Sequence, residues 1–142
     1  MNLKTMDQAE LEGKTVLVKV DYNVPLKKND QGQMVITDDT RIKITLPTIE
    51  YLRAKGCKVI LMSHVGRPDG TVEEDFRMNP MAIRLSELLK VPVAKVDEVV
   101  GEKVQEAVRN MAPGDVLMLE NNRFEPGETK NDEELAKKLA SL

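Results

Sequence analysis

The side chains with the clearest chemical use in this sequence are basic groups that stand where apolar segments stop or a helix begins. Four residues occupy such positions: Arg41, His64, Arg67 and Arg123. Asp21 and Asn23 follow another apolar segment in the same way. Arginine forks and helix starts both suit phosphate or carboxylate, and each charge-assisted hydrogen bond contributes about 1.5–3 kcal/mol. Together these groups predict a site for a small phosphorylated acid.

Arg41 supports this prediction on electrostatic grounds. It follows Asp38, Asp39 and Thr40 at the expected start of a helix. A cation in the first helical turn faces the positive end of the helix dipole, which is mildly unfavourable. A bound anion would reverse the sign of that interaction.

Other site chemistries fit the residue types less well. His64 is the only histidine, and its neighbour Ser63 points to the opposite face of an extended segment, which argues against a serine–histidine nucleophile. One histidine and one cysteine do not make a transition-metal site. A helix cap is the default interpretation of Asp38 and Asp39, ahead of a magnesium site. The sequence also lacks a GxxxxGK[ST] phosphate loop. We therefore expect no metal site in this chain.

Short apolar segments are the elements that must position these groups. They predict buried strands at residues 15–20, 58–62 and 115–119, with a weaker candidate at 91–96. Residues 27–37 form a polar excursion that is compatible with a small hairpin.

Helical periodicity fills the intervals between the strands. The expected helices cover residues 40–55, 79–89, 102–111 and a last segment from residue 131. Pro47 should kink the first of them or split it into a short turn and a main helix. Asn79 and Pro80 are expected at the N-cap and the first helical position. Asn131 with Glu134 resembles a capping box.

This alternation predicts an α/β fold, a three-layer Rossmann-like domain whose mainly parallel sheet has right-handed crossovers and helices on both faces. Ligands of such sheets lie beyond the carboxyl ends of the strands, where the basic groups should gather. The final "ELAKKLASL" stops on a periodic leucine without a stop signal. We therefore expect residues 1–142 to be one partial domain, incomplete at its C-terminal end.

Composition limits the class of protein. The 142 residues suit one domain, and 41% hydrophobic with 32% charged residues is typical of a soluble globular chain. A net charge of −3 argues against binding nucleic acid through bulk positive charge. We found neither a signal peptide nor a membrane-spanning stretch. A single cysteine, Cys57, suits a reducing interior, so a cytoplasmic location is expected.

Five ordered segments resemble the phosphoglycerate kinase family. They are "VLVKVDYNVPL" (16–26), "ITDDTRIKITLPTIEYLRAKG" (36–56), "KVILMSHVGRP" (58–68), "GDVLMLENNRF" (114–124) and "PGETKND" (126–132). In that family such segments belong to the N-terminal domain, which binds 3-phosphoglycerate or 1,3-bisphosphoglycerate. The resemblance therefore implies one half of a glycolytic kinase that transfers a phosphoryl group between 1,3-bisphosphoglycerate and ADP.

The resemblance also implies a role for each candidate residue. Asp21 and Asn23 would hold the hydroxyl and carboxyl region of the substrate. Arg41 would be catalytic, because it would stabilise the phosphoryl group in flight. His64, Arg67 and Arg123 would bind the 3-phosphate and orient the triose. The family's usual residues are replaced at Lys19, Tyr22, Val65 and Asn122, none of which is a named ligand.

The family's nucleotide site implies what this chain should lack. Mg-ATP or Mg-ADP sits on a separate C-terminal domain, so no cofactor is expected here, and the expected partners are 3-phosphoglycerate and that missing domain. The parent protein is expected to be monomeric. The isolated chain should bind the triose phosphate weakly without turning it over.

Two other functions stay open at this point. One is a non-catalytic triose-phosphate-binding module, used as a sensor or as the partner of a separate C-terminal half. The other is an aspartyl-phosphate phosphotransferase with Asp21 as nucleophile. Asn23 weakens that hypothesis, because it occupies the second acidic position of a D-x-D-x-T pattern.

Overall fold

The computed structural model describes residues 2–142. Its strands are β1 (Thr15–Lys19), β2 (Leu26–Lys28), β3 (Met34–Ile36), β4 (Lys58–Met62), β5 (Val93–Lys95) and β6 (Val116–Met118). Its α-helices are α1 (Thr40–Lys43), α2 (Leu46–Ala54), α3 (Asn79–Leu89), α4 (Glu102–Arg109) and α5 (Glu133–Ala140). Three short 3₁₀ turns cover Met6–Gln8, Glu74–Phe76 and Asn122–Phe124.

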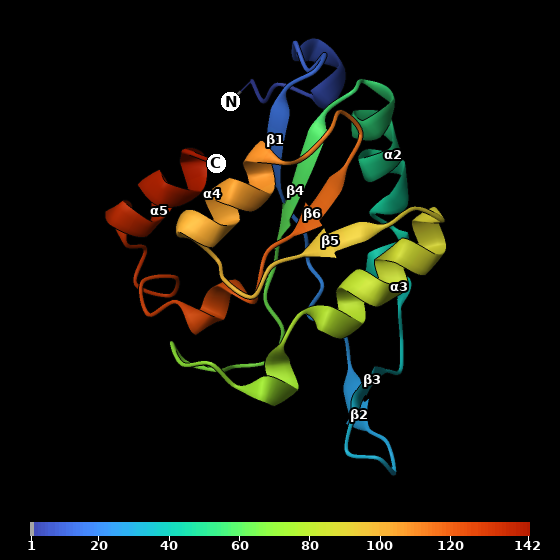
Figure 1. Ribbon diagram of the computed structural model, residues 1–142, viewed down its shortest axis with the longest axis vertical. Helices are drawn as coiled ribbons and strands as arrows, with labels where there is room; N and C mark the ends of the chain where they lie inside the picture. The colour runs from blue at the N-terminus through green and yellow to red at the C-terminus, as the bar shows by residue number, and fades with distance from the viewer. Residues whose placement is uncertain (1) are drawn as a thin grey trace.

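Four strands form one parallel sheet in the order β1-β4-β6-β5. The central strand β4 pairs Ile60 with Leu17 on one side and with Leu117 on the other. Its three middle residues are fully buried, because helices cover both faces of the sheet. The predicted parallel α/β architecture is confirmed. The carboxyl ends of its strands lie at the lower end of the sheet in Figure 1.

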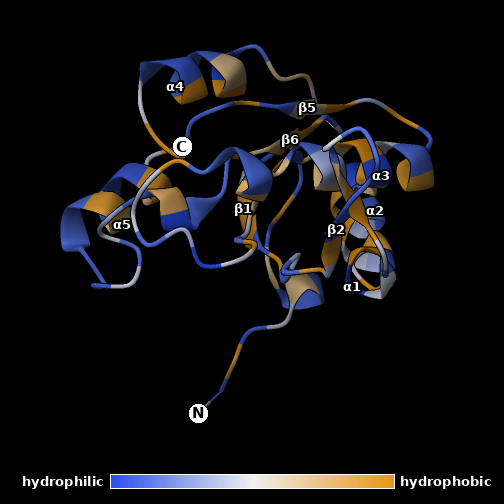
Figure 2. Ribbon diagram, turned by 90° about the horizontal axis from the view of Figure 1, so that it is seen from below, coloured by the Kyte–Doolittle hydropathy of each residue, from blue (hydrophilic) through white to orange (hydrophobic). Residues whose placement is uncertain are grey.

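Side-chain alternation along β4 divides the core into two halves. Val59 and Leu61 face α2 and α3 and pack in one cluster with Leu52 and Leu85. Ile60 faces the other way and belongs to a second cluster with Val104 and Val108 of α4. Leu139 of α5 and Leu142 just beyond it pack against this cluster. Figure 2 shows the resulting three layers, with α4 and α5 on one side of the sheet and α1, α2 and α3 on the other.

The polar excursion at residues 27–37 is a hairpin in which β2 pairs antiparallel with β3. Its turn is held by Asn29, whose Oδ1 accepts hydrogen bonds from the backbone N–H groups of Gln31 (3.0 Å) and Gln33 (2.9 Å). The hairpin projects away from the sheet (Figure 1). Leu26 and Ile36, which pair at its base, pack against the main core.

The first predicted helix is split at Pro47, which was one of the two expected effects of this proline, the other being a kink. α1 ends at Lys43, and α2 starts at Leu46 with Pro47 in its first turn. Proline is tolerated there because its missing N–H would have had no partner inside the helix.

Two expected helix caps were wrong. The N-cap of α3 is Met78, whose N–H donates to the buried carboxylate of Glu120 at 2.9 Å, and Asn79 is already helical. At α5, Asp132 is the cap and accepts the Leu135 N–H at 3.1 Å. Asn131 takes a left-handed conformation (φ 53°), which asparagine tolerates better than most residues.

Cys57 is fully buried just before β4. Its Sγ lies 3.1 Å from the carbonyl oxygen of Leu11, which accepts its weak hydrogen bond. Among residues 2–142, no helix has both the length and the apolar character needed to cross a membrane.

Candidate anion-binding site at the strand ends

Tyr22 fixes the segment that follows β1. It is fully buried, and its N–H donates to Ser63 Oγ at 2.9 Å. Its hydroxyl donates to Thr45 Oγ1 at 2.6 Å, since Thr45 itself donates to the carbonyl oxygen of Ile42. Burial raises the pKa of Tyr22 to about 12, so the phenol stays protonated. Because Tyr22 points inward, its neighbours Asp21 and Asn23 point outward.

Arg41, in the first turn of α1, meets this segment. Its Nη1 donates to both carboxylate oxygens of Asp21, at 3.0 and 3.1 Å, and to the carbonyl oxygen of Asn23 at 3.0 Å. Both charged side chains are at least half exposed. Asp21 therefore orients Arg41, and within residues 2–142 the Nε and Nη2 of Arg41 form no hydrogen bond.

Arg123, beyond the end of β6, lies against the loop that follows β4. Its Nη1 is 3.5 Å from the carbonyl oxygen of Gly66, and its Nε is 3.5 Å from Glu128 Oε2. The Nε and Oε2 atoms are both buried but lack hydrogen-bond geometry. The guanidinium is therefore held near Glu128 without being fully engaged by it.

The Gly66 peptide joins the two groups of side chains. Its N–H donates to Asn23 Oδ1 at 3.1 Å, and its carbonyl faces Arg123. The loop is fixed in place, because Gly66 has φ 64° and a Cβ there would lie 2.5 Å from the ring of Phe76. The loop after β4 thus brings the Asp21–Asn23–Arg41 group next to Arg123.

His64 lies among these charges. Burial lowers its pKa below the ordinary value of 6.5, and the positive charge of Arg123 lowers it further. The acidic groups of Glu128 and Asp21 act in the opposite direction. His64 is therefore mainly neutral at pH 7, and a bound anion would raise its pKa.

This lowered pKa predicts a pH dependence of stability. Unfolded chains bind a proton at His64 near pH 6.5, whereas the folded chain binds it only at lower pH, so the free energy of unfolding should fall as the pH drops through this range. The loss is expected to be small, since His64 is only partly buried. We expect urea midpoints between pH 8 and pH 5 to fall more steeply for the wild type than for His64→Asn. Parallel pH profiles would contradict the shift.

Arg67 is the candidate that the structure connects least to the others. It directly follows Gly66 and is exposed. In the described part of the chain its side chain makes neither a hydrogen bond nor an ion pair with another residue. Five of the six predicted residues are thus brought together, and Arg67 stands at the rim with its guanidinium free.

Lys19 is a further basic group near the site and was not among the predicted site residues. It ends β1, and its positive charge contributes to the lowered pKa of His64. The two-residue spacing of Lys19, Asp21 and Asn23 places all three on one face of an extended segment. That spacing is the signal that could have identified it.

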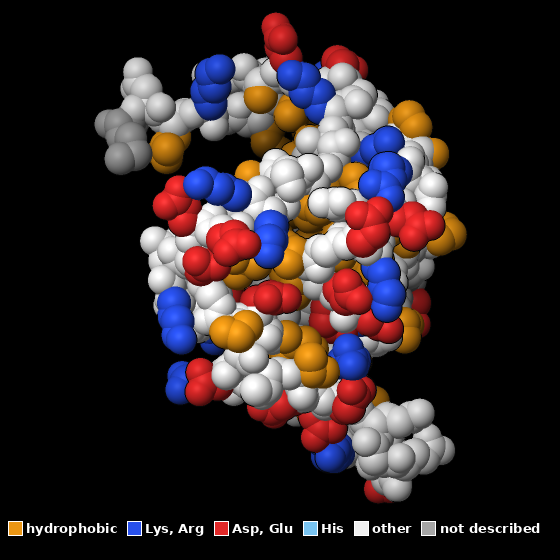
Figure 3. All heavy atoms as spheres, turned by 60° about the vertical axis from the view of Figure 1, so that its left-hand side comes forward, with side chains coloured by type: hydrophobic (Ala, Val, Ile, Leu, Met, Phe, Trp, Pro, Cys, Tyr) orange, Lys and Arg blue, Asp and Glu red, His pale blue; other side chains and the backbone are white. Residues whose placement is uncertain are grey.

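The site is open to solvent, since Asp21, Asn23, Arg41 and Arg67 are all exposed. A cavity of about 740 Å³ lies between β3 and α3, and none of the six predicted residues lines it. The charged side chains along that cavity already have ion-pair partners, as Arg84 has Glu87 and Asp75 has Lys28, so the strand ends are the better candidate for an anion site. Figure 3 shows acidic and basic side chains interspersed over one face of the molecule. An anion must therefore be attracted by local groups.

A parallel sheet, helices on both faces and basic groups at the strand ends define a Rossmann-like α/β domain, the class that takes ligands beyond the carboxyl ends of its strands. The family model described as phosphoglycerate kinase matches residues 6–142. The chain belongs to the phosphoglycerate kinase family.

Similar proteins agree with this assignment. The chain is 54% identical over 140 residues to the phosphoglycerate kinase of Picosynechococcus sp.. These aligned residues cover 99% of this chain and 34% of that protein. It is 56% identical over 133 residues to the phosphoglycerate kinase of Dictyoglomus turgidum, covering 94% of this chain and 32% of that protein.

Solved structures give the same result. The crystal structure of phosphoglycerate kinase from Pyrococcus horikoshii OT3 matches with a TM-score of 0.85 at 35% identity, over 98% of this chain and 34% of that one. Phosphoglycerate kinase from Coxiella burnetii matches with a TM-score of 0.80 at 35% identity, over 96% and 32%. The chain thus spans about a third of the length of the relatives it matches.

Proposed function

We propose that this chain binds 3-phosphoglycerate and 1,3-bisphosphoglycerate as the substrate-binding part of a glycolytic kinase. The parent protein transfers a phosphoryl group between 1,3-bisphosphoglycerate and ADP. One observation carries the proposal: the Gly66 peptide joins Asn23, beside the Asp21–Arg41 pair, to Arg123. Family membership supplies the substrate class.

Each residue has a role in this proposal. Asp21 and Asn23 hold the hydroxyl and carboxyl region of the triose. His64, Arg67 and Arg123 bind the 3-phosphate. Arg41 donates its free N–H groups to the phosphoryl group during transfer, while Asp21 keeps the guanidinium oriented.

Such a site would act by positioning the substrate and by neutralising its negative charge. Phosphoryl transfer needs little covalent chemistry from the protein, since aligning the reactants and neutralising the developing charge lower the barrier. The neutral imidazole of His64 can donate one hydrogen bond without a full positive charge. When a phosphate dianion binds, His64 takes up a proton more readily and adds a further charge.

We propose no nucleotide or magnesium site on the residues of this chain. The sequence has no GxxxxGK[ST] loop, and residues 2–142 contain no cluster of three or more histidine, cysteine, aspartate or glutamate side chains that could hold a metal ion. From the family resemblance we propose that Mg-ATP or Mg-ADP binds residues outside this chain, in a separate domain. On this proposal the 142-residue chain binds substrate but does not turn it over.

Titration calorimetry tests the proposal. We expect saturable binding of one 3-phosphoglycerate per chain that weakens as salt is added. Glycerate, which lacks the phosphate, should bind at least about tenfold more weakly, a difference of about 1.4 kcal/mol. Equal affinity for the two ligands, or no saturation, would contradict the proposed site. ATP-dependent phosphorylation of 3-phosphoglycerate by the pure chain would refute the absence of turnover.

A further inference from the structure

Asn121 is a fully buried amide between β6 and the turn that carries Arg123. Its Nδ2 donates to the carbonyl oxygens of Val65 at 2.7 Å and Phe76 at 2.9 Å. Its Oδ1 accepts the Arg123 N–H at 3.1 Å. Both donors and the acceptor of this side chain are therefore used.

The partners of Asn121 adjoin the proposed ligand residues. Val65 stands between His64 and Gly66 in the loop after β4. The ring of Phe76 lies directly against Gly66, the residue whose peptide faces Asn23 and Arg123. One side chain thus ties together three segments that are far apart in the sequence.

Backbone hydrogen bonds join the same segments. The Asn122 N–H donates to the carbonyl oxygen of Ser63 at 3.0 Å, and the Gly70 N–H donates to that of Arg123 at 3.0 Å. The loop after β4 and the segment after β6 therefore form one hydrogen-bonded unit, with Asn121 inside it.

Only an amide of this size satisfies the arrangement. An aspartate has the same shape but would place a carboxylate against two carbonyl oxygens and supply no donor for them. Alanine would remove the hydrogen-bond partner of both carbonyl groups, which is costly at the buried Val65 carbonyl. The residue type is thus specified by the two carbonyl groups that it must satisfy.

We infer that Asn121 is a positioning residue that holds the His64 loop and Arg123 in register, so that both face one anion. This inference rests on the proposed function and extends it to a residue that touches no substrate.

The test compares Asn121→Asp with Val108→Ala, a cavity-forming change in α4 outside this unit. Affinity for 3-phosphoglycerate and the NMR signals of the His64 ring are measured at a temperature where both variants are folded by circular dichroism. We expect Asn121→Asp to lose at least tenfold in affinity and to shift the His64 signals without ligand. Val108→Ala should be less stable than the wild type, but its affinity for 3-phosphoglycerate and its His64 signals should be unchanged. Wild-type affinity and unshifted His64 signals in folded Asn121→Asp would overturn the inference.

A failure of the proposed function would be distinguishable from a failure of this inference. If the wild type did not bind 3-phosphoglycerate, the proposed function would be wrong, whereas the shift of the His64 signals without ligand would still test Asn121.

A measurement on the wild type covers the case in which Asn121→Asp does not fold. The side-chain amide protons of Asn121 should exchange with solvent far more slowly than those of the exposed Asn110, and they should shift when 3-phosphoglycerate is added. Exchange as fast as that of Asn110, or no shift in a chain that binds the ligand, would overturn the inference.

Discussion

Replacing Arg123 by alanine should lower the affinity for 3-phosphoglycerate about a hundredfold. The guanidinium can offer a phosphate two charge-assisted hydrogen bonds, and at the low end of about 1.5 kcal/mol each their loss corresponds to that factor. The change also leaves Glu128, now 3.5 Å from Arg123 Nε, as an uncompensated negative charge beside the site. Titration calorimetry at low salt measures the effect.

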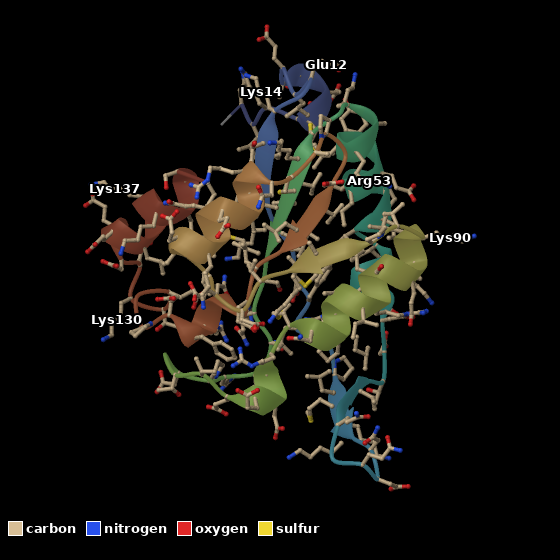
Figure 4. All side chains as sticks on the ribbon, in the orientation of Figure 1. Glu12, Lys14, Arg53, Lys90, Lys130 and Lys137 are labelled. Carbon is tan, nitrogen blue, oxygen red and sulfur yellow. The ribbon has the colours of Figure 1, made fainter. Side chains whose placement is uncertain are left out.

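Two further variants make this prediction sharper. Arg123→Lys keeps the charge but loses the planar fork, so its affinity should lie between those of the wild type and Arg123→Ala. Lys14→Ala removes the same charge at the other end of the sheet (Figure 4) and should change the affinity less than twofold. If Arg123→Ala bound within threefold of the wild type, Arg123 would not be a ligand.

Replacing Glu120 by alanine should destabilise the fold by about 3–5 kcal/mol, the usual cost of removing one partner of a buried ion pair. Its carboxylate is 1% exposed and accepts the N–H groups of Met78 at 2.9 Å and Asn121 at 2.8 Å. It also accepts from Arg77 Nη1 at 3.1 Å and forms an ion pair with the nearly buried Lys95. Without it, two backbone donors and two cations would lose a partner.

Urea unfolding measures this change in the free energy of unfolding. Glu12→Ala is the matched control, because Glu12 pairs with Lys55 at 3.2 Å on the surface (Figure 4), where an ion pair contributes about 0–1 kcal/mol. A loss for Glu120→Ala no larger than that for Glu12→Ala would show that the buried network adds little to stability.

The strands could be predicted because their physical cause is local. A strand covered on both faces must be apolar along its whole length, and the segment that became β4 reads that way with its bounds unchanged. The other strands of the sheet are shorter than their apolar segments. Leu119, for example, lies beyond β6, although it is fully buried and its N–H still donates to the carbonyl oxygen of Leu61 at 3.0 Å.

The helix caps could not be predicted in the same way. Met78 takes the cap position of α3, and its N–H donates to Glu120, which is 42 positions away. A hydrogen bond over this distance has no local signature in the sequence.

In the candidate site, too, some residues could be predicted from local sequence and others could not. Ligands lie beyond the carboxyl ends of parallel strands, and applying this rule needs only the order of strands and loops. On that basis Asp21, Asn23 and Arg123 could be predicted to lie close together. The amide of Asn121 was not foreseen, because its two acceptors are backbone carbonyl groups with no signature in the sequence.

The most direct test of the account titrates His64 by NMR with and without 3-phosphoglycerate. His64 is the only histidine in the chain, so its ring signals are unambiguous. The account predicts a pKa below the ordinary 6.5 in the free chain, raised when the ligand is present, with the Nε signals of Arg41, Arg67 and Arg123 moving at the same ligand concentration. An unchanged His64 pKa with unmoved arginine signals at saturating ligand would contradict the claim that these four side chains face one anion.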